Sequence, residues 1–90
     1  MAEIRVTVLG EHSYTVEVME GASKTVHEVT LAEGDARRYG GECAPERLVE
    51  ASFEFLLERE PKESILRHFE LSVIEQYFPE YPDAIRKALS

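Results

Sequence analysis

The sequence has one cysteine, no tryptophan and few basic residues, and each scarcity narrows what the chain can be. A single thiol, Cys43, cannot form a disulfide within the chain, which favours a reducing compartment, and we expect a cytoplasmic protein. Ten basic residues against 18 acidic ones give a formal net charge of −8. This balance disfavours non-specific binding to nucleic acid and to anionic membranes. No apolar run approaches the roughly 20 residues that span a bilayer, and residues 1–9 do not resemble a signal peptide.

The length of 90 residues predicts a single domain, 1–90, and the first third of it has the pattern of strands. Apolar and polar residues alternate at about 4–8 and 14–19, a period of two that indicates strands with one buried face. A third strand is expected at about 24–31, where the alternation slips once. Either Val26 packs on the outer face or a bulge corrects the register. Short connections favour an antiparallel β-meander over residues 1–32.

The stretch from Pro45 to Glu60 is expected to be the central helix of the helical part, residues 33–90. Its apolar residues recur at the helical spacing, Pro45 fits the first helical position, and Pro61 ends the run. The opposite face carries a glutamate at every fourth position, and like charges at this spacing repel weakly. The four residues of this acidic face are Glu46, Glu50, Glu54 and Glu58.

Proline-bounded segments after the central helix predict two or three short helices. We expect one at 64–69, one that Ser72 caps with Glu75 in a capping box, and a last one that begins at Pro82. Strands followed by helices predict an α+β fold, with the helices packed on one face of the antiparallel sheet.

The sequence shows no arrangement of residues typical of catalysis or of metal binding. The histidines are isolated, with no ligand spacing, and His27, in phase with the apolar residues of its strand, is expected to be a hydrogen-bonded structural residue. Glu42 and Glu46 flank Cys43, and negative charge disfavours a reactive thiolate. We therefore expect no enzyme, no metal and no cofactor.

Two groups of residues are candidates for binding a partner. The acidic face is either a solvated surface or a docking strip for a protein with a basic surface. The aromatic group Tyr77, Phe78 and Tyr81 either closes the core under the last helix or forms a recognition patch, since aromatics are enriched at interaction hot spots. Tyr77 and Tyr81 are its candidate contacts with a partner.

DNA binding is the alternative function. Residues 63–77 have the order of a helix-turn-helix reader, and residues 29–60 have the strand-helix-helix order of ribbon-helix-helix repressors and antitoxins. The second helix of the first segment would present Glu75 and Gln76 outward, without the Arg or Lys that phosphate contacts need. The strand of the second segment has Glu28 and Thr30 as its outward candidates, which makes nucleic acid the less favoured partner.

The run LLEREPKESILRHFELSVIEQYFPEY, residues 56–81, resembles the C-terminal part of a group of small uncharacterised prokaryotic proteins. They share the Leu-Leu-Glu-Arg-Glu-Pro turn, the Ile-Leu-Arg-x-Phe segment and the Tyr-Phe-Pro-Glu-Tyr ending. The resemblance implies a free-standing cytoplasmic protein of a prokaryote and implies no activity.

Together these observations predict a small acidic domain that acts as a non-enzymatic interaction or accessory protein, as a monomer or a weak homodimer.

Overall fold

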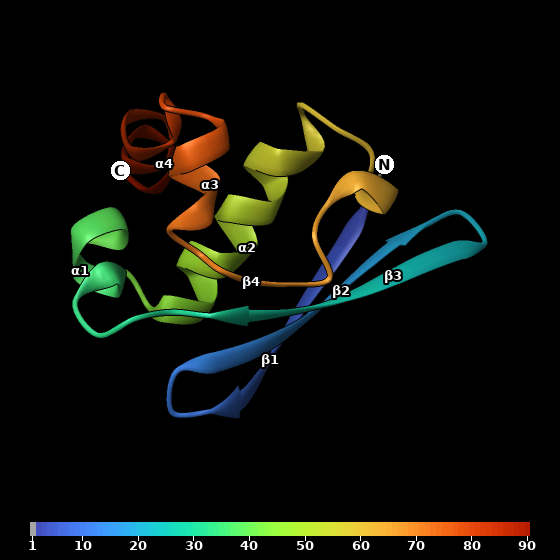
Figure 1. Ribbon diagram of the computed structural model, residues 1–90, viewed down its shortest axis with the longest axis horizontal. Helices are drawn as coiled ribbons and strands as arrows, with labels where there is room; N and C mark the ends of the chain where they lie inside the picture. The colour runs from blue at the N-terminus through green and yellow to red at the C-terminus, as the bar shows by residue number, and fades with distance from the viewer. Residues whose placement is uncertain (1) are drawn as a thin grey trace.

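A four-stranded sheet carries all the helices on one of its faces in the computed structural model, which describes residues 2–90 (Figure 1). Strands β1 (Glu3–Gly10), β2 (Ser13–Glu20) and β3 (Ser23–Thr30) form an antiparallel meander. The short strand β4 (His68–Glu70) then pairs with β3 in parallel, so that the spatial order is β1-β2-β3-β4. The predicted α+β fold with an N-terminal meander is confirmed, and the fourth strand adds to it.

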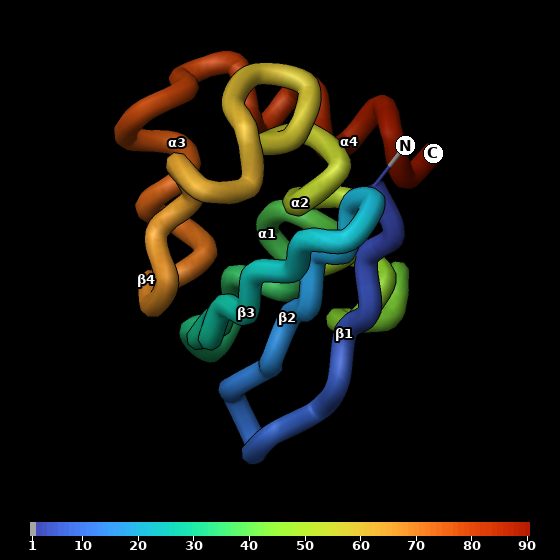
Figure 2. Tube along the Cα trace, turned by 90° about the vertical axis from the view of Figure 1, so that its right-hand side faces the viewer, coloured from blue at the N-terminus to red at the C-terminus, as the bar shows by residue number. Residues whose placement is uncertain are grey.

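The helices follow the meander and lie above it in Figure 1. They are α1 (Asp35–Gly40), α2 (Pro45–Leu57), the 3₁₀ turn η1 (Lys62–Ser64), α3 (Val73–Tyr77) and α4 (Tyr81–Leu89). Figure 2 shows the same arrangement from the side, with β4 at the outer edge beside β3. No helix formed by residues 2–90 is long and apolar enough to cross a bilayer.

The core lies between the inner face of the sheet and α2. Val16, Val18 and Val29 point inward from β2 and β3 and are fully buried. Phe53 of α2 packs over this row, and its ring lies 5.3 Å from the ring of His27. The alternation that slips in the sequence resolves without a bulge, because the β2–β3 register is continuous and Val26 lies on the outer face.

The helix expected at residues 64–69 is wrong. The chain turns once in η1, becomes extended at Ile65, and then forms β4. The backbone N–H of Glu28 donates to the carbonyl of Arg67 at 2.8 Å, and the N–H of Leu71 donates to the carbonyl of Thr30 at 2.9 Å. Pairing with β3 therefore takes the backbone groups that a helix would have used within itself.

The central helix begins at Pro45, as expected, and ends at Leu57 rather than at residue 60. Glu58 and Arg59 form a turn instead, and the chain bends at Glu60. Pro61 accounts for the early end, because a proline has no N–H to donate to the carbonyl four residues earlier, here that of Leu57, and disfavours the helical conformation of the residue before it.

The predicted capping box of α3 is also wrong, although the helix begins directly after Ser72, as expected. The Ser72 side chain makes no capping hydrogen bond. The Glu75 carboxylate instead accepts hydrogen bonds from Arg38, at 2.8 Å, and from the Tyr39 hydroxyl, at 2.7 Å. Glu75 therefore ties α3 to α1.

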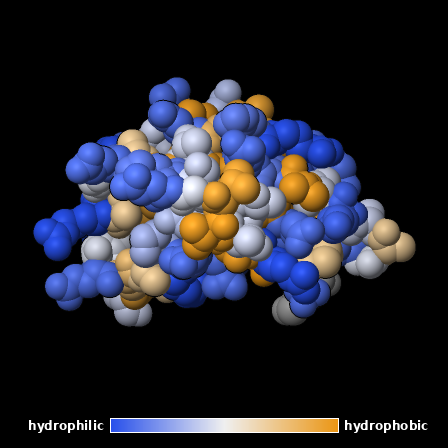
Figure 3. Space-filling view, turned by 90° about the horizontal axis from the view of Figure 1, so that it is seen from below, coloured by the Kyte–Doolittle hydropathy of each residue, from blue (hydrophilic) through white to orange (hydrophobic). Residues whose placement is uncertain are grey.

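The outer face of the sheet carries no helix and is mostly polar. Figure 3, seen from below, shows separate orange patches among blue side chains on this side of the molecule. The carboxylate of Glu17 lies 3.9 Å from Arg5 and 3.3 Å from Lys24, one on each neighbouring strand. These cross-strand ion pairs are exposed to solvent, which limits each to a modest contribution to stability.

Candidate functional site

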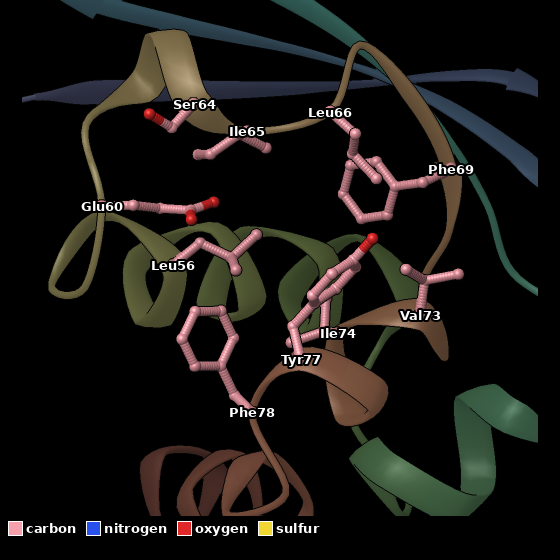
Figure 4. A pocket seen from close by; sticks show the side chains of 10 residues that line it. All are labelled: Leu56, Glu60, Ser64, Ile65, Leu66, Phe69, Val73, Ile74, Tyr77 and Phe78. Atoms are coloured by element: carbon pink, nitrogen blue, oxygen red, sulfur yellow. The ribbon is translucent and has the colours of Figure 1, made fainter.

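An apolar pocket of about 340 Å³ opens between α3 and the segment that links α2 to β4 (Figure 4). Eight apolar residues line it: Leu56, Ile65, Leu66, Phe69, Val73, Ile74, Tyr77 and Phe78. Glu60 and Ser64 are its polar residues. The lining comes from four separate segments, so the pocket exists only when α2, the extended segment, β4 and α3 are all in place.

The depth of the pocket follows from the burial of its residues. Leu56 and Ile74 are almost completely buried, while Leu66 and Tyr77 are 48 % and 67 % exposed. Exposed apolar side chains that are grouped around an apolar hollow, rather than scattered singly, are typical of a binding site. A partner group that enters the pocket would cover both of them.

The carboxylate of Glu60 points into the pocket, between the side chains of Leu56 and Ile65 (Figure 4). The nearby basic residues are engaged elsewhere. Arg59 pairs with the carboxylates of Glu58 and Glu80 and lies 3.6 Å from the ring of Phe55. Glu60 therefore has no ion-pair partner among residues 2–90.

Lys62 lies two residues after Glu60, and it is held even more firmly than Arg59. Its side chain is only 3 % exposed. The ammonium lies 2.6 Å from the carboxylate of Glu63 and 3.8 Å from that of Glu20, on the hairpin turn of the sheet. A buried ammonium with two carboxylates cannot turn toward Glu60 without losing its compensating charges.

The acidic face of α2 is exposed, as expected, but some of its carboxylates form ion pairs. Arg47 bridges Glu50, at 3.1 Å, and Glu54, at 3.4 Å. Glu46, at the first turn of the helix, pairs with no cation among the described residues. Its charge adds to burial in raising the pKa of Tyr14 on β2, with burial as the larger cause.

The two aromatic candidates separate in the structure. Tyr77 lies at the rim of the pocket, two-thirds exposed, where it is free to contact a partner. Tyr81 is fully buried, so its assignment to a surface site is wrong. Its ring packs against those of Tyr39 and Phe55, at centroid distances of 5.2 and 5.3 Å, and closes the core under α4.

His27 has the structural role expected from the sequence. It is fully buried, and its ring nitrogens lie 2.8 Å from the carbonyl of Leu66 and 2.8 Å from the hydroxyl of Thr25. Burial lowers the pKa of His27, with a smaller opposing effect from the Leu66 carbonyl. No group of three or more metal-ligating side chains occurs within residues 2–90.

A second hollow, of about 470 Å³, lies beside Cys43 and the end of α4. Arg37, Arg38 and Arg86 line it. Arg38 is committed to Glu75, and Arg86 lies 3.4 Å from Asp83. Among residues 2–90, the thiol of Cys43 has only the carbonyl of Leu89 as a hydrogen-bond partner, at 3.7 Å, and none of these residues places a base to activate it.

Sequence reasoning missed most of the apolar pocket, and Tyr77 is the one residue of it that was expected to bind a partner. The error lies at residues 64–69, because a helix there would have put Ile65, Leu66 and Phe69 together against the core. In the structure, Ile65 of the extended segment and Phe69 of β4 point inward, while Leu66 remains at the rim. Glu60 could not be singled out from the sequence, because it is one of several glutamates in this part of the chain.

Comparison of the sequence and the structure with protein-family models, curated proteins and solved structures found no match.

Proposed function

We propose that this chain is a non-enzymatic interaction domain that receives an apolar side chain of a partner protein in the pocket between α3 and the segment before β4. The exposed rim formed by Leu66 and Tyr77 supports the proposal, because it presents apolar surface around a hollow large enough for a side chain. The polar residues of the pocket, Glu60 and Ser64, have no histidine beside them in the lining. The pocket therefore favours binding over catalysis.

The acidic face of α2 supplies a second element of the proposal. A net charge of −8 favours encounter with a basic partner over a broad surface. The apolar pocket would then provide the specific contact, and the charges would guide the approach.

Two observations disfavour the arrangements that suggested DNA binding. The first helix of the expected helix-turn-helix is the strand β4. The strand that a ribbon-helix-helix dimer would pair with its twin is β3, which already has β2 on one side and β4 on the other. Specific binding of genomic DNA fragments in a gel shift at low salt would reopen this alternative.

Partner capture with matched variants tests the pocket. The variant Leu66→Ser with Tyr77→Ser removes the rim, and the control Leu9→Ser with Val26→Ser removes two similarly exposed apolar side chains elsewhere. We expect the wild type and the control to retain one set of proteins by mass spectrometry, and the rim variant to lose it. Retention of the same proteins by all three forms would show that the pocket is not the site.

The acidic face is tested separately with Glu50→Lys and Glu54→Lys together. The change relieves repulsion along the helix but removes both partners of Arg47, so we expect the free energy of unfolding to stay within about 0.5 kcal/mol of the wild type. Loss of partner capture by this folded variant would identify a docking strip. Unchanged capture would identify a surface that only keeps the protein in solution.

A further inference from the structure

We propose that the occupant of the pocket is an extended, basic segment of the partner, which pairs with the open edge of β4 and places a Lys or Arg against Glu60. This inference rests on the proposed function and specifies the chemistry of the partner. Two independent observations carry it, namely the unpaired carboxylate in the pocket and the free backbone groups of β4.

The unpaired carboxylate of Glu60 calls for a basic group on the partner. Glu60 points between apolar side chains, and both neighbouring cations are held by other carboxylates. A partner that covered Glu60 with an apolar group would remove its hydration without replacement, which is costly. A partner that brought an ammonium or guanidinium group would replace that hydration with a charge-assisted hydrogen bond. The pocket therefore selects an apolar anchor with a cation close to it.

The edge of β4 supplies the backbone contacts. Because the carbonyl of Arg67 and the N–H of Leu71 bond to β3, residues 67, 69 and 71 turn their backbone groups toward the sheet. In a parallel ladder the residues between them, His68 and Glu70, turn theirs away. No strand formed by the described residues lies beyond β4 in the sheet. An added strand would pair there, as in other proteins that extend a sheet with a peptide.

Strand geometry then sets the spacing within the segment. Successive side chains of a strand point to opposite faces, so residues i and i+2 both face the pocket side. One of them would fill the pocket beside Phe69, and the other would carry the charge that meets Glu60. On the opposite face, Glu28 and Glu70 are accessible and would accept further basic residues. The expected motif is an apolar residue with Lys or Arg two positions away, in a segment of net positive charge.

The test is a selection of phage-displayed random dodecapeptides on the purified full chain, followed by fluorescence polarisation of the enriched peptides. We expect enrichment of the motif just described. Glu60→Gln should weaken the selected peptides about fivefold, as expected for loss of one partly buried ion pair. The control Glu11→Gln removes the same charge from an exposed position in the β1–β2 turn, outside the pocket and the acidic face, and should change nothing.

Hydrogen exchange of the backbone amides of His68 and Glu70 tests whether a bound peptide pairs with the open edge of β4. Bound peptide should slow the exchange of the His68 and Glu70 N–H groups at least tenfold, as for hydrogen-bonded strand amides. Unchanged exchange at both would overturn the strand pairing. Peptides that are apolar but not basic, with no effect of Glu60→Gln, would overturn the inference while the interaction function stands. Failure to enrich any peptide would count against the inference and the proposed function together.

Discussion

The buried hydrogen bonds of Ser52 provide a quantitative test of how the helical layer is held. Ser52 Oγ on α2 lies 2.7 Å from the carbonyl of Leu48 and 2.6 Å from the hydroxyl of Tyr81 on α4. A serine has a single proton, and a carbonyl can only accept. The order is therefore fixed: Tyr81 donates to Ser52, and Ser52 donates to Leu48. All of this lies away from solvent, since Ser52 and Tyr81 are both 0 % exposed.

Replacing Ser52 with alanine leaves the Tyr81 hydroxyl buried without an acceptor. An orphaned buried polar group costs about 1–3 kcal/mol, and the better helix propensity of alanine returns up to about 0.5 kcal/mol. We expect Ser52→Ala to lower the free energy of unfolding by about 0.5–3 kcal/mol, which corresponds to a fall of roughly 2–24 °C in Tm for a domain of this size. Urea unfolding followed by circular dichroism measures the change.

The double variant Ser52→Ala with Tyr81→Phe removes both hydroxyls and leaves neither orphaned. It should therefore be more stable than the sum of the single changes predicts, by about 1 kcal/mol. Tyr81→Phe alone should cost about 0.5–1.5 kcal/mol, because Ser52 keeps its bond to Leu48. Strict additivity of the two changes, with unchanged denaturant slopes, would refute the proposed hydrogen-bond chain.

Two further predictions concern single side chains of the core and its border. Burial lowers the pKa of His27, so the unfolded chain binds a proton near pH 6.5 more readily than the folded chain does. The free energy of unfolding should therefore fall as the pH drops below about 6.5, by at most about 1.4 kcal/mol per pH unit. His27→Gln should make this pH dependence less steep in urea unfolding, and an unchanged slope would contradict the assignment to His27. Arg59→Lys loses the contact with the Phe55 ring and should lower the free energy of unfolding by about 0.5–1 kcal/mol. Arg37→Lys, at an exposed position, is the control in the same denaturation series. Equal effects of the two changes would show that the contact with the Phe55 ring does not stabilise the protein.

The meander and the central helix could be read from the sequence because their patterns are local. Period-two alternation gives β1 and β2 directly, and Pro45 marks the first residue of α2. Even the irregular third strand was partly predictable, since His27 stood in phase with Val29 and both face the core. Each of these assignments depends on residues within a few positions of one another.

The segment before α3 could not be read in the same way because its structure is determined by a distant strand. Ile65, Leu66 and Phe69 fit one helical face, and only pairing with β3 makes Phe69 a strand residue. The pocket and the inward carboxylate of Glu60 depend on that strand, so they were hidden as well. The burial of Tyr81 could not be predicted for a related reason, because the Ser52 hydroxyl that accepts its hydrogen bond lies 29 positions earlier in the chain.

The late position of β4 in the chain has a consequence for the order of folding. The three strands of the meander are joined by tight turns and can form early, whereas β4 must close a loop of about 40 residues before it reaches β3, at a cost in chain entropy. The pocket, built on that closure, would be among the last parts to form and the first to open. Substitutions that weaken or strengthen the pairing of β4 with β3 would then change the fraction of molecules with a formed pocket. The meander and α2 would remain folded in either case.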